Sequence, residues 1–138
     1  GDCSVEEGEA IKSELSKIDF SSFDLNLKGA GCFSTGKRPR VLWIGVEDDE
    51  QLNGLNRKIV NSLERAGVKY EKRKFYPHVT LARLRNNASS ETAPSFIKAN
   101  NLYRSRSFTA DRFFLYSSIL KPDGAEHYRE AEYLLNEY

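Results

Sequence analysis

The sequence predicts an α+β domain with a mostly antiparallel sheet and helices packed on its outside. Segments with the apolar spacing of helices are interleaved with segments that have the pattern of strands, which favours helices packed against one sheet. No low-complexity linker or internal repeat divides the 138 residues, and this length suits one domain. The prediction is therefore a single domain over residues 1–138.

The N-terminal part of the chain predicts a helix followed by a strand. Ser4 and Glu7 have the spacing of a capping box, and apolar residues then recur at roughly helical spacing, so a helix is expected near 4–18. Apolar and polar residues alternate over 23–28, which is the period of a half-buried strand. The two glycines in 29–31 either loosen the end of this strand or mark a bulge.

The middle of the chain predicts a basic turn, a buried strand and an amphipathic helix. Residues 37–40 are expected to form the turn, and the apolar run 41–46 is typical of a central strand covered on both faces. A helix over 48–66 follows, with aspartates at its start as candidate caps and an apolar stripe along its length. Gly67 stands where a glycine commonly ends a helix.

The C-terminal part alternates between strands and one short helix. The charged segment 69–74 is expected to be a loop or an edge strand, and 75–84 a strand. A short helix is expected around 90–99, and a strand, with a bend, over 107–120. Residues 128–135 are interpreted as a last strand, with a short helix as the alternative.

The composition excludes two classes of protein. Apolar residues make up 39% of the chain and aromatic residues 12%, which is too apolar for a disordered tail. No apolar run is long enough to span a membrane. The two cysteines, Cys3 and Cys32, form neither a disulfide framework nor a CxxC metal motif, so we expect free thiols in a reducing cytoplasm and no metal site.

The net charge of +1 is distributed unevenly along the chain. Residues 69–85 carry six basic side chains against one acidic side chain, whereas the flanking segments 1–24 and 122–138 are acidic. This pattern predicts a local anion site rather than a general nucleic-acid-binding surface. A solvated charged face is the alternative interpretation.

His78 is the first candidate for acid–base chemistry, because the chain has only two histidines. Successive side chains of a strand point to opposite faces, so His78 and Thr80 share one face. They are expected to point together into a groove, while Val79 and Leu81 anchor the opposite face of the strand in the core.

An imidazole, a hydroxyl and a guanidinium on one face suit phosphate-ester chemistry. The imidazole of His78 can take or give a proton near neutral pH, and Thr80 can donate a hydrogen bond to a phosphoryl oxygen. Arg83 would add charge-assisted hydrogen bonds to the phosphate. Strict alternation places Arg83 on the Val79 face, so this arrangement requires that the strand ends or bulges near Ala82.

The same residues are also consistent with interpretations in which neither histidine is catalytic. A His-x-Thr pattern on a strand also suits a histidine with a purely structural hydrogen bond, in an α+β domain without a phosphate site. The other histidine, His127, has an acidic neighbour and no hydroxyl two residues further on. It is expected at the surface or in a turn.

Residues 78–83 (HVTLAR) resemble the second signature of the 2H phosphoesterases, specifically of the RNA 2′,3′-cyclic phosphodiesterase group historically called 2′-5′ RNA ligases. The resemblance covers about 23–135. Residues 38–46 resemble the turn and strand that precede the family's middle helix, and 114–118 and 122–124 resemble its C-terminal strand and turn. The resemblance implies a two-lobed α+β fold in which two H-x-T strands face a central groove.

The chain departs from the family pattern because it contains one H-x-T motif instead of two. In the family the first motif precedes a Gly-acidic turn and a helix, which Gly1, Asp2 and the helix after Ser4 resemble. The absence of methionine fits a chain that begins downstream of the first motif, so an N-terminal strand is expected to be missing. The resemblance implies that an upstream segment or a neighbouring chain supplies the second histidine.

The activity that the resemblance implies is hydrolysis of a terminal 2′,3′-cyclic phosphate on RNA to a 2′-phosphate, with neither metal nor cofactor. Reverse 2′-5′ ligation by the same site is implied too, and tRNA-like fragments are among the expected substrates. The resemblance makes His78 the base, and assigns Thr80 and Arg83 to the phosphoryl oxygens. Arg40 is expected to bind the phosphates of the RNA backbone, with Arg38 and Lys74 as further candidates.

The aromatic residues near His78 have two possible roles. Phe75, Tyr76 and Trp43 are candidates for stacking on a base, although core packing is the expected role of Trp43. The alternative to the enzyme is a catalytically inactive RNA- or nucleotide-binding module, because only one H-x-T motif is present.

Overall fold

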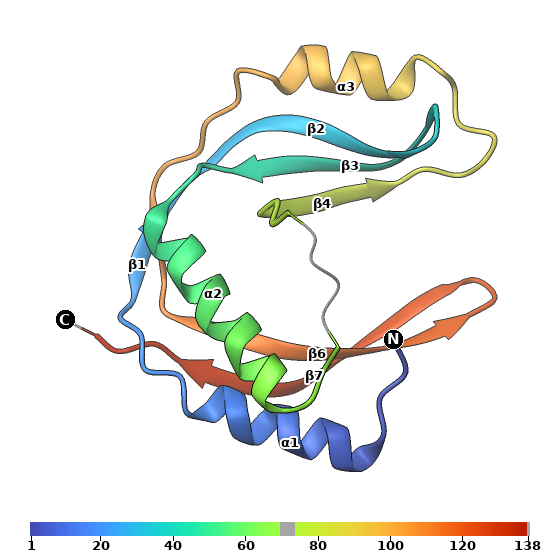
Figure 1. The fold of residues 1–138 in the computed structure, drawn as a ribbon. Helices are drawn as coiled ribbons and strands as arrows, with labels where there is room; N and C mark the ends of the chain where they lie inside the picture. The colour runs from blue at the N-terminus through green and yellow to red at the C-terminus, as the bar shows by residue number, and fades with distance from the viewer. Residues whose placement is uncertain (70–73, 138) are drawn as a thin grey trace. The chain divides into compact units, whose positions relative to one another are not determined.

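The chain, seen in a computed structural model that describes residues 1–69 and 74–137, folds into α-helices and antiparallel strands in the order α1-β1-β2-β3-α2-β4-α3-β5-β6-β7 (Figure 1). This confirms the predicted α+β class. The chain forms two compact units, and each is assembled from segments that are distant in sequence. Unit 1 comprises Gly1–Phe23, Glu50–Lys72 and Thr109–Tyr138, and unit 2 comprises Asp24–Asp49 and Arg73–Phe108.

Unit 1 packs two helices with a long hairpin. Its elements are α1 (Val5–Ser16), α2 (Glu50–Arg65), β6 (Arg112–Lys121) and β7 (Gly124–Leu134). The two strands pair antiparallel, and α1 packs against both α2 and β7. Leu15, Leu55 and Leu135 are buried in this unit, which is what the apolar stripes of the two helices predict.

Unit 2 contains a three-stranded antiparallel sheet in the order β2-β3-β4. Its strands are β2 (Leu27–Thr35), β3 (Arg38–Val46) and β4 (His78–Arg83), and its helix is α3 (Thr92–Asn100). The helix packs on β2 and β3, and Figure 1 shows it lying along these strands. β4 is therefore an edge strand that lies beyond the cover of the helix.

The structure confirms the predicted start of α1 and the predicted end of α2. The Ser4 hydroxyl accepts a hydrogen bond from the Glu7 backbone N–H at 3.1 Å and so caps α1, as the capping-box spacing predicts. Gly67 follows α2 with a φ of 86°, the left-handed conformation that favours glycine. None of the helices in the described part of the chain is long and apolar enough to cross a membrane.

Two expected strands are each divided into two elements. The alternating pattern of 23–28 is split between β1 (Phe23–Leu25) and the start of β2, and the pattern of 107–120 is split between β5 (Phe108–Ala110) and β6. β1 and β5 form a small two-stranded sheet of their own. Each break marks a change of pairing partner, because β1 pairs with β5 whereas β2 pairs with β3 and β6 pairs with β7.

Other boundaries differ because pairing decides them. The glycines of 29–31 mark a bulge in β2, which continues to Thr35, rather than its end. β3 begins at Arg38, inside the expected basic turn, because that residue pairs with Thr35. The interpretation of 128–135 as a strand is confirmed, and β7 starts earlier because Gly124 pairs with Lys121. The charged segment 69–74 falls largely outside the described residues.

The central strand, β3, is fully buried on one face only, whereas the sequence predicts burial on both faces. Leu42 and Ile44 are buried on the face of β3 where α3 packs, as expected. Val41 and Trp43 alternate with them on the other face and are only half-buried. The expectation of a strand covered on both faces was therefore wrong, because α3, the helix among the described residues of unit 2, covers a single face of its sheet.

A carboxylate links the two helices of unit 1 and provides a pH-dependent test of its packing. Glu14 on α1 binds Lys17 at 2.8 Å and Arg65 of α2 at 3.1 Å, and these two side chains hold its pKa below the ordinary value. A carboxyl with a lowered folded-state pKa stabilises the fold above its unfolded pKa, and this contribution is lost as the pH falls through its folded pKa.

We expect Glu14→Gln to lower the urea midpoint of unfolding at neutral pH and to make no difference at strongly acidic pH. Urea titrations of both proteins at a series of pH values measure this. The matched control is Asp2→Asn, which removes an exposed carboxylate that has no ion pair with a described residue. A midpoint difference for Glu14→Gln that stays constant down to strongly acidic pH would contradict the assignment.

Candidate functional site

Strand β4 presents His78, Thr80 and Arg83 on one face of the unit 2 sheet. Directly opposed residues of antiparallel strands have their side chains on the same side of the sheet. The partners of the three residues occupy alternate positions on β3 and so share one face of it. The pairs are His78 with Gly45, Thr80 with Trp43, and Arg83 with Val41.

A bulge at Leu81 brings Arg83 to this face. Ala82 pairs with Leu42 and Thr80 pairs with Trp43, so Leu81 is an extra residue of β4 without a counterpart on β3. If the pairing were regular through Leu81, with no bulge, strict alternation would place Arg83 on the face of Val79. The structure therefore contains the bulge near Ala82 that Arg83 needs in order to share a face with His78.

The expectation that Val79 and Leu81 anchor β4 in the core was wrong. Their side chains are 43% and 56% exposed, respectively. Val79 pairs with Ile44 and so lies on the same side of the sheet as that buried residue, but the helix packs mainly on β2 and β3, and Val79 on β4 stays exposed. Leu81 is exposed because it is the bulge residue of an edge strand.

The imidazole of His78 is oriented by the backbone. Its Nδ1 lies 2.5 Å from the carbonyl oxygen of Tyr76. Because a carbonyl oxygen only accepts hydrogen bonds, Nδ1 carries a proton, and in the neutral imidazole Nε2 therefore has the lone pair. His78 is exposed, so this lone pair is accessible to a water molecule or a substrate. This is the arrangement that a general base needs.

Two aromatic rings lie beside the imidazole of His78. Phe33 packs edge-on against His78 with ring centroids 4.8 Å apart, and Trp43 lies 6.1 Å away. Phe33 also contacts Trp43 at 5.3 Å and Tyr76 at 6.3 Å. Trp43 packs over the backbone of Gly31, which agrees with its expected packing role. The rings limit the positions that the His78 side chain can adopt.

Gly31 makes room for this aromatic packing, and its replacement tests the arrangement. A Cβ at Gly31 would lie 2.2 Å from Cζ2 of Trp43, so alanine there must displace the indole. We expect Gly31→Ala to destabilise the protein by about 1–3 kcal/mol through overpacking. Urea unfolding followed by the fluorescence of Trp43, the chain's one tryptophan, measures the loss.

Gly8→Ala is the matched control for that substitution. A Cβ at Gly8 would meet only the Cys3 sulfur, at 4.0 Å, and alanine is preferred in a helix, so we expect a stabilisation of about 0.5–1 kcal/mol. Equal and small effects of the two substitutions would contradict the close approach of Trp43 to Gly31.

Thr80 and Arg83 are free to bind a ligand. Both are exposed, and neither side chain forms a hydrogen bond or an ion pair with residues 1–69 or 74–137. Their β3 partners are two residues apart, so they lie about 7 Å from each other along the strand. A long guanidinium side chain spans that separation, so a phosphoryl group above Thr80 is within reach of Arg83.

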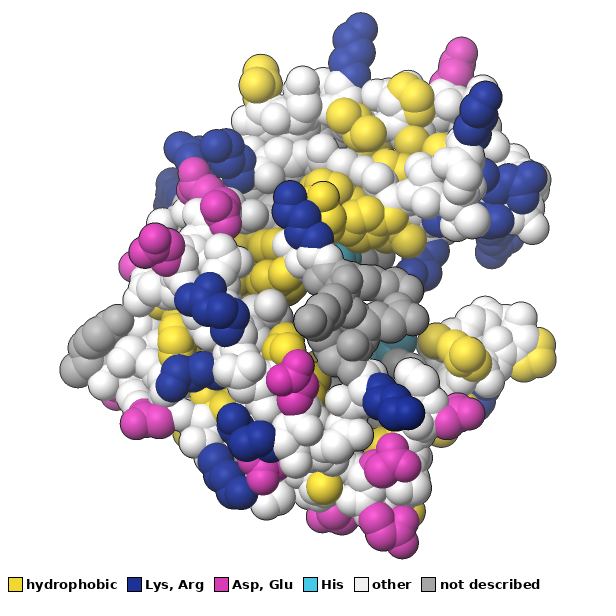
Figure 2. All heavy atoms as spheres, viewed as in Figure 1, with side chains coloured by type: hydrophobic (Ala, Val, Ile, Leu, Met, Phe, Trp, Pro, Cys, Tyr) yellow, Lys and Arg dark blue, Asp and Glu magenta, His cyan; other side chains and the backbone are white. Residues whose placement is uncertain are grey.

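Arg40 lies at the other end of the sheet from His78. It is five residues from Gly45, the partner of His78, which corresponds to about 16 Å along β3. Its guanidinium donates to Oδ1 of Asn86 at 2.6 Å. Arg38 donates to the same oxygen at 3.2 Å. Figure 2 shows Lys and Arg side chains gathered at this end of unit 2.

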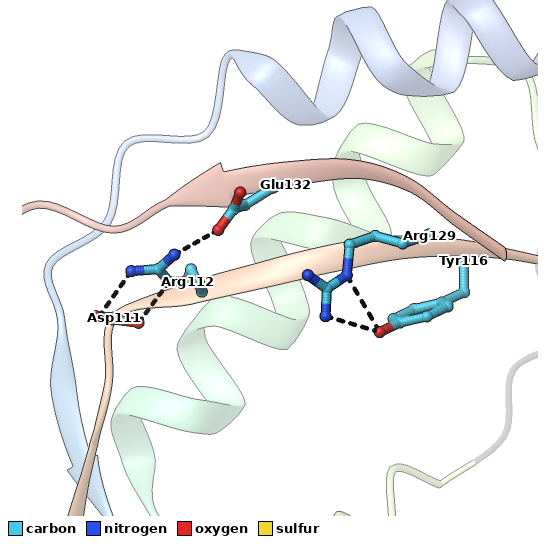
Figure 3. Close-up of polar contacts among 5 residues, drawn as sticks. All are labelled: Asp111, Arg112, Tyr116, Arg129 and Glu132. Atoms are coloured by element: carbon cyan, nitrogen blue, oxygen red, sulfur yellow. Dashed lines mark hydrogen bonds and ion pairs between the residues drawn. The ribbon is translucent and has the colours of Figure 1, made fainter.

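Unit 1 holds polar clusters of its own on the β6–β7 hairpin (Figure 3). Arg112 binds Asp111 at 2.9 Å and Glu132 at 2.5 Å, and this guanidinium holds the pKa of Asp111 below its ordinary value. Arg129 stacks 4.0 Å above the ring of Phe114 and points towards the hydroxyl of Tyr116. These are paired charges and stacked rings that stabilise the hairpin.

His127 belongs to the same hairpin and is exposed, as expected of a surface histidine. Its Nδ1 lies 2.7 Å from the hydroxyl of Ser118, the residue opposite it on β6. Among the described residues, no group of three or more His, Cys, Asp or Glu side chains is arranged to hold a metal ion.

Sequence reasoning missed Phe33, Gly31 and Asn86. Phe33 and Gly31 contact the site through cross-strand pairing, and a hairpin alignment of 27–35 with 38–46 would have indicated both. Asn86 was not detectable, because its role depends on the path of the loop after β4 rather than on a sequence pattern.

Comparison with known proteins gives a consistent result. The family profile described as the 2′-5′ RNA ligase superfamily matches residues 3–121. A Thermotoga maritima protein named RNA 2′,3′-cyclic phosphodiesterase is 34% identical over 131 residues, which cover 85% of this chain and 65% of that relative. An Archaeoglobus fulgidus protein of the same name is 32% identical over 127 residues, covering 90% of this chain and 69% of that relative. The chain thus spans about two thirds of the length of these relatives.

Solved structures show the same fold. E. coli LigT complexed with 3′-AMP superposes with a TM-score of 0.75 at 25% sequence identity, covering 98% of this chain and 72% of that chain. A second structure, described only as a phosphoesterase, has a TM-score of 0.74 at 25% identity, again with 98% of this chain covered. The match therefore extends over both units.

Proposed function

The chain belongs to the 2′-5′ RNA ligase superfamily, and from this membership we propose that it hydrolyses the terminal 2′,3′-cyclic phosphate of RNA to a 2′-phosphate. One observation carries the proposal. The bulge at Leu81 places an imidazole, a hydroxyl and a guanidinium on one exposed face of β4, through His78, Thr80 and Arg83. The names of the relatives from Thermotoga and Archaeoglobus agree with this chemistry.

The proposed reaction uses His78 as the base. Its Nε2 takes a proton from the attacking water, whose oxygen forms a bond to phosphorus as the bond from phosphorus to the 3′ oxygen breaks. Thr80 and Arg83 hold the phosphoryl oxygens and stabilise the negative charge that develops on them. The departing 3′ oxygen takes a proton from a second acid.

We propose that the second acid is a histidine from an upstream segment or a neighbouring chain. His127, the chain's other histidine, lies on β7 in unit 1 and binds Ser118. In the reverse reaction, the same groups would join a 2′,3′-cyclic phosphate and a 5′ hydroxyl through a 2′-5′ linkage. Tyr76, which is 53% exposed beside His78, is a candidate to stack on the terminal base.

We also propose RNA fragments with cyclic phosphate ends, tRNA-like fragments among them, as substrates in the cytoplasm. Cys3 and Cys32 are both free thiols, which suits a reducing compartment.

The test is an assay of the protein expressed from its complete gene, with nucleoside 2′,3′-cyclic phosphates as substrates and EDTA present. We expect hydrolysis, with the 2′-phosphate as the product on chromatography. Loss of turnover on adding EDTA would contradict the metal-independent mechanism. Tight binding of the same nucleotides without turnover would overturn the enzyme and favour a binding module.

A further inference from the structure

Unit 2 contains a cavity that the proposed reaction does not use. It has a volume of about 410 Å³ and lies between the β2–β3 turn and the segment that follows β4. We call it the loop pocket. The side chains used in the argument below are Lys37, Arg38, Arg85, Asn86 and Ser89.

The loop pocket is basic. Lys37, Arg38 and Arg85 are among its lining residues, and none of the lining residues is acidic. Within residues 1–69 and 74–137, no carboxylate forms an ion pair with any of the three. Their charges are therefore available to an anion, in contrast to the paired charges of the β6–β7 hairpin.

The neutral amide of Asn86 binds two guanidinium groups, one from the pocket residue Arg38 and one from its neighbour Arg40. Asn86 accepts a hydrogen bond from Arg38 at 3.2 Å and another from Arg40 at 2.6 Å through the same oxygen. A carboxylate at this position would cancel one of the two charges, whereas the amide orients the guanidinium groups and leaves both charges uncompensated. Ser89 accepts a hydrogen bond from the Glu91 backbone N–H, so its own hydroxyl proton remains available to a ligand. Guanidinium, ammonium and hydroxyl donors around one cavity suit a phosphodiester.

The position of the loop pocket relative to His78 decides which phosphate it can bind. The β3 partners of His78 and Arg83 are four residues apart, which corresponds to about 13 Å along the strand. The pocket residue Arg85 follows Arg83 in the chain. A phosphoryl group at His78 therefore cannot also contact the pocket. A phosphate further along the same RNA strand can.

We propose that the loop pocket binds a backbone phosphate of the RNA strand whose 2′,3′-cyclic end lies at His78. This proposal rests on the proposed function, and it adds that the protein acts on oligonucleotides in preference to cyclic mononucleotides.

The test compares hydrolysis of a nucleoside 2′,3′-cyclic phosphate with that of oligoribonucleotides of increasing length that end in the same cyclic nucleotide. The variant is Lys37→Gln/Arg85→Gln. We expect kcat/KM for the longer oligonucleotides to fall roughly tenfold or more, with no change for the mononucleotide. The dependence of oligonucleotide binding on salt should weaken by about one unit of slope for each lost phosphate contact.

The matched control is Lys58→Gln/Lys98→Gln, which removes the same amount of charge from exposed helical positions outside the pocket. An equal effect of the two double variants on oligonucleotides, or no effect of the pocket variant, would overturn the proposal. If the wild-type protein hydrolyses neither substrate, the proposed function fails on its own. Fluorescence anisotropy with labelled single-stranded RNA then tests the pocket, whose double variant should still bind more weakly than the control.

Discussion

Replacing His78 with alanine is expected to lower kcat/KM for hydrolysis of a terminal 2′,3′-cyclic phosphate by about 10²- to 10⁴-fold. His78 is the histidine of the exposed β4 face, and its Nδ1 bond to the Tyr76 carbonyl leaves Nε2 as the proton acceptor. Its removal leaves Thr80 and Arg83 in place, so binding of the phosphate should be reduced much less than turnover. Steady-state hydrolysis of a nucleoside 2′,3′-cyclic phosphate, with binding of a 2′-nucleotide measured separately, checks both parts.

His127→Ala is the matched control for this substitution. It removes the chain's other imidazole, which is exposed on β7 and binds Ser118. We expect an activity within a few-fold of the wild type. Circular dichroism should be unchanged in both variants, since both histidines are exposed. A loss with His127→Ala as large as that with His78→Ala, or activity retained by His78→Ala, would refute the assignment of the base.

Inserting one alanine between Ala82 and Arg83 is expected to lower kcat by about 10²- to 10³-fold without removing any proposed catalytic group. The bulge at Leu81 brings Arg83 to the face of Thr80, and one further residue after Ala82 shifts Arg83 by one position of the alternation. Arg83 would then lie on the opposite face from His78, and its charge would be lost from the phosphoryl oxygens. Arg83→Ala should produce a loss of the same size with the backbone intact.

The control for the insertion is Leu81→Ala. It keeps the bulge and trims a side chain that is already 56% exposed, so both activity and stability should change little. The urea midpoint of each variant shows whether the fold survives. A folded insertion variant with full activity would show that Arg83 is not needed on the His78 face. Full activity of Arg83→Ala would show the same even if the insertion variant does not fold.

The α+β class and most helices followed from local patterns, because their causes are local. The cap of α1 at Ser4 and the glycine after α2 at Gly67 depend on residues within a few positions of each helix end. The strands were harder to delimit. The break between β1 and β2 and the early start of β7 depend on pairing with distant segments.

The errors at Val79 and Leu81 have the same origin. Alternation correctly separated them from His78 and Thr80, but it does not show whether a helix covers their side of the sheet. In the structure α3 packs over β2 and β3, and the edge strand β4 stays exposed. Burial is a property of what packs against a strand, and this cannot be obtained from the period of the strand itself.

The sequence alone determined the family of this protein and the residue types of its site, because six consecutive residues, HVTLAR, carry the imidazole, the hydroxyl and the guanidinium. Only the tertiary structure decided that these three groups share a face. That depends on one extra residue in the pairing of β4 with β3, and alternation along a single strand contains no information about its partner. The tertiary structure also placed Arg40 with Asn86 at the far end of the sheet, since loop paths bring together residues that no local pattern connects.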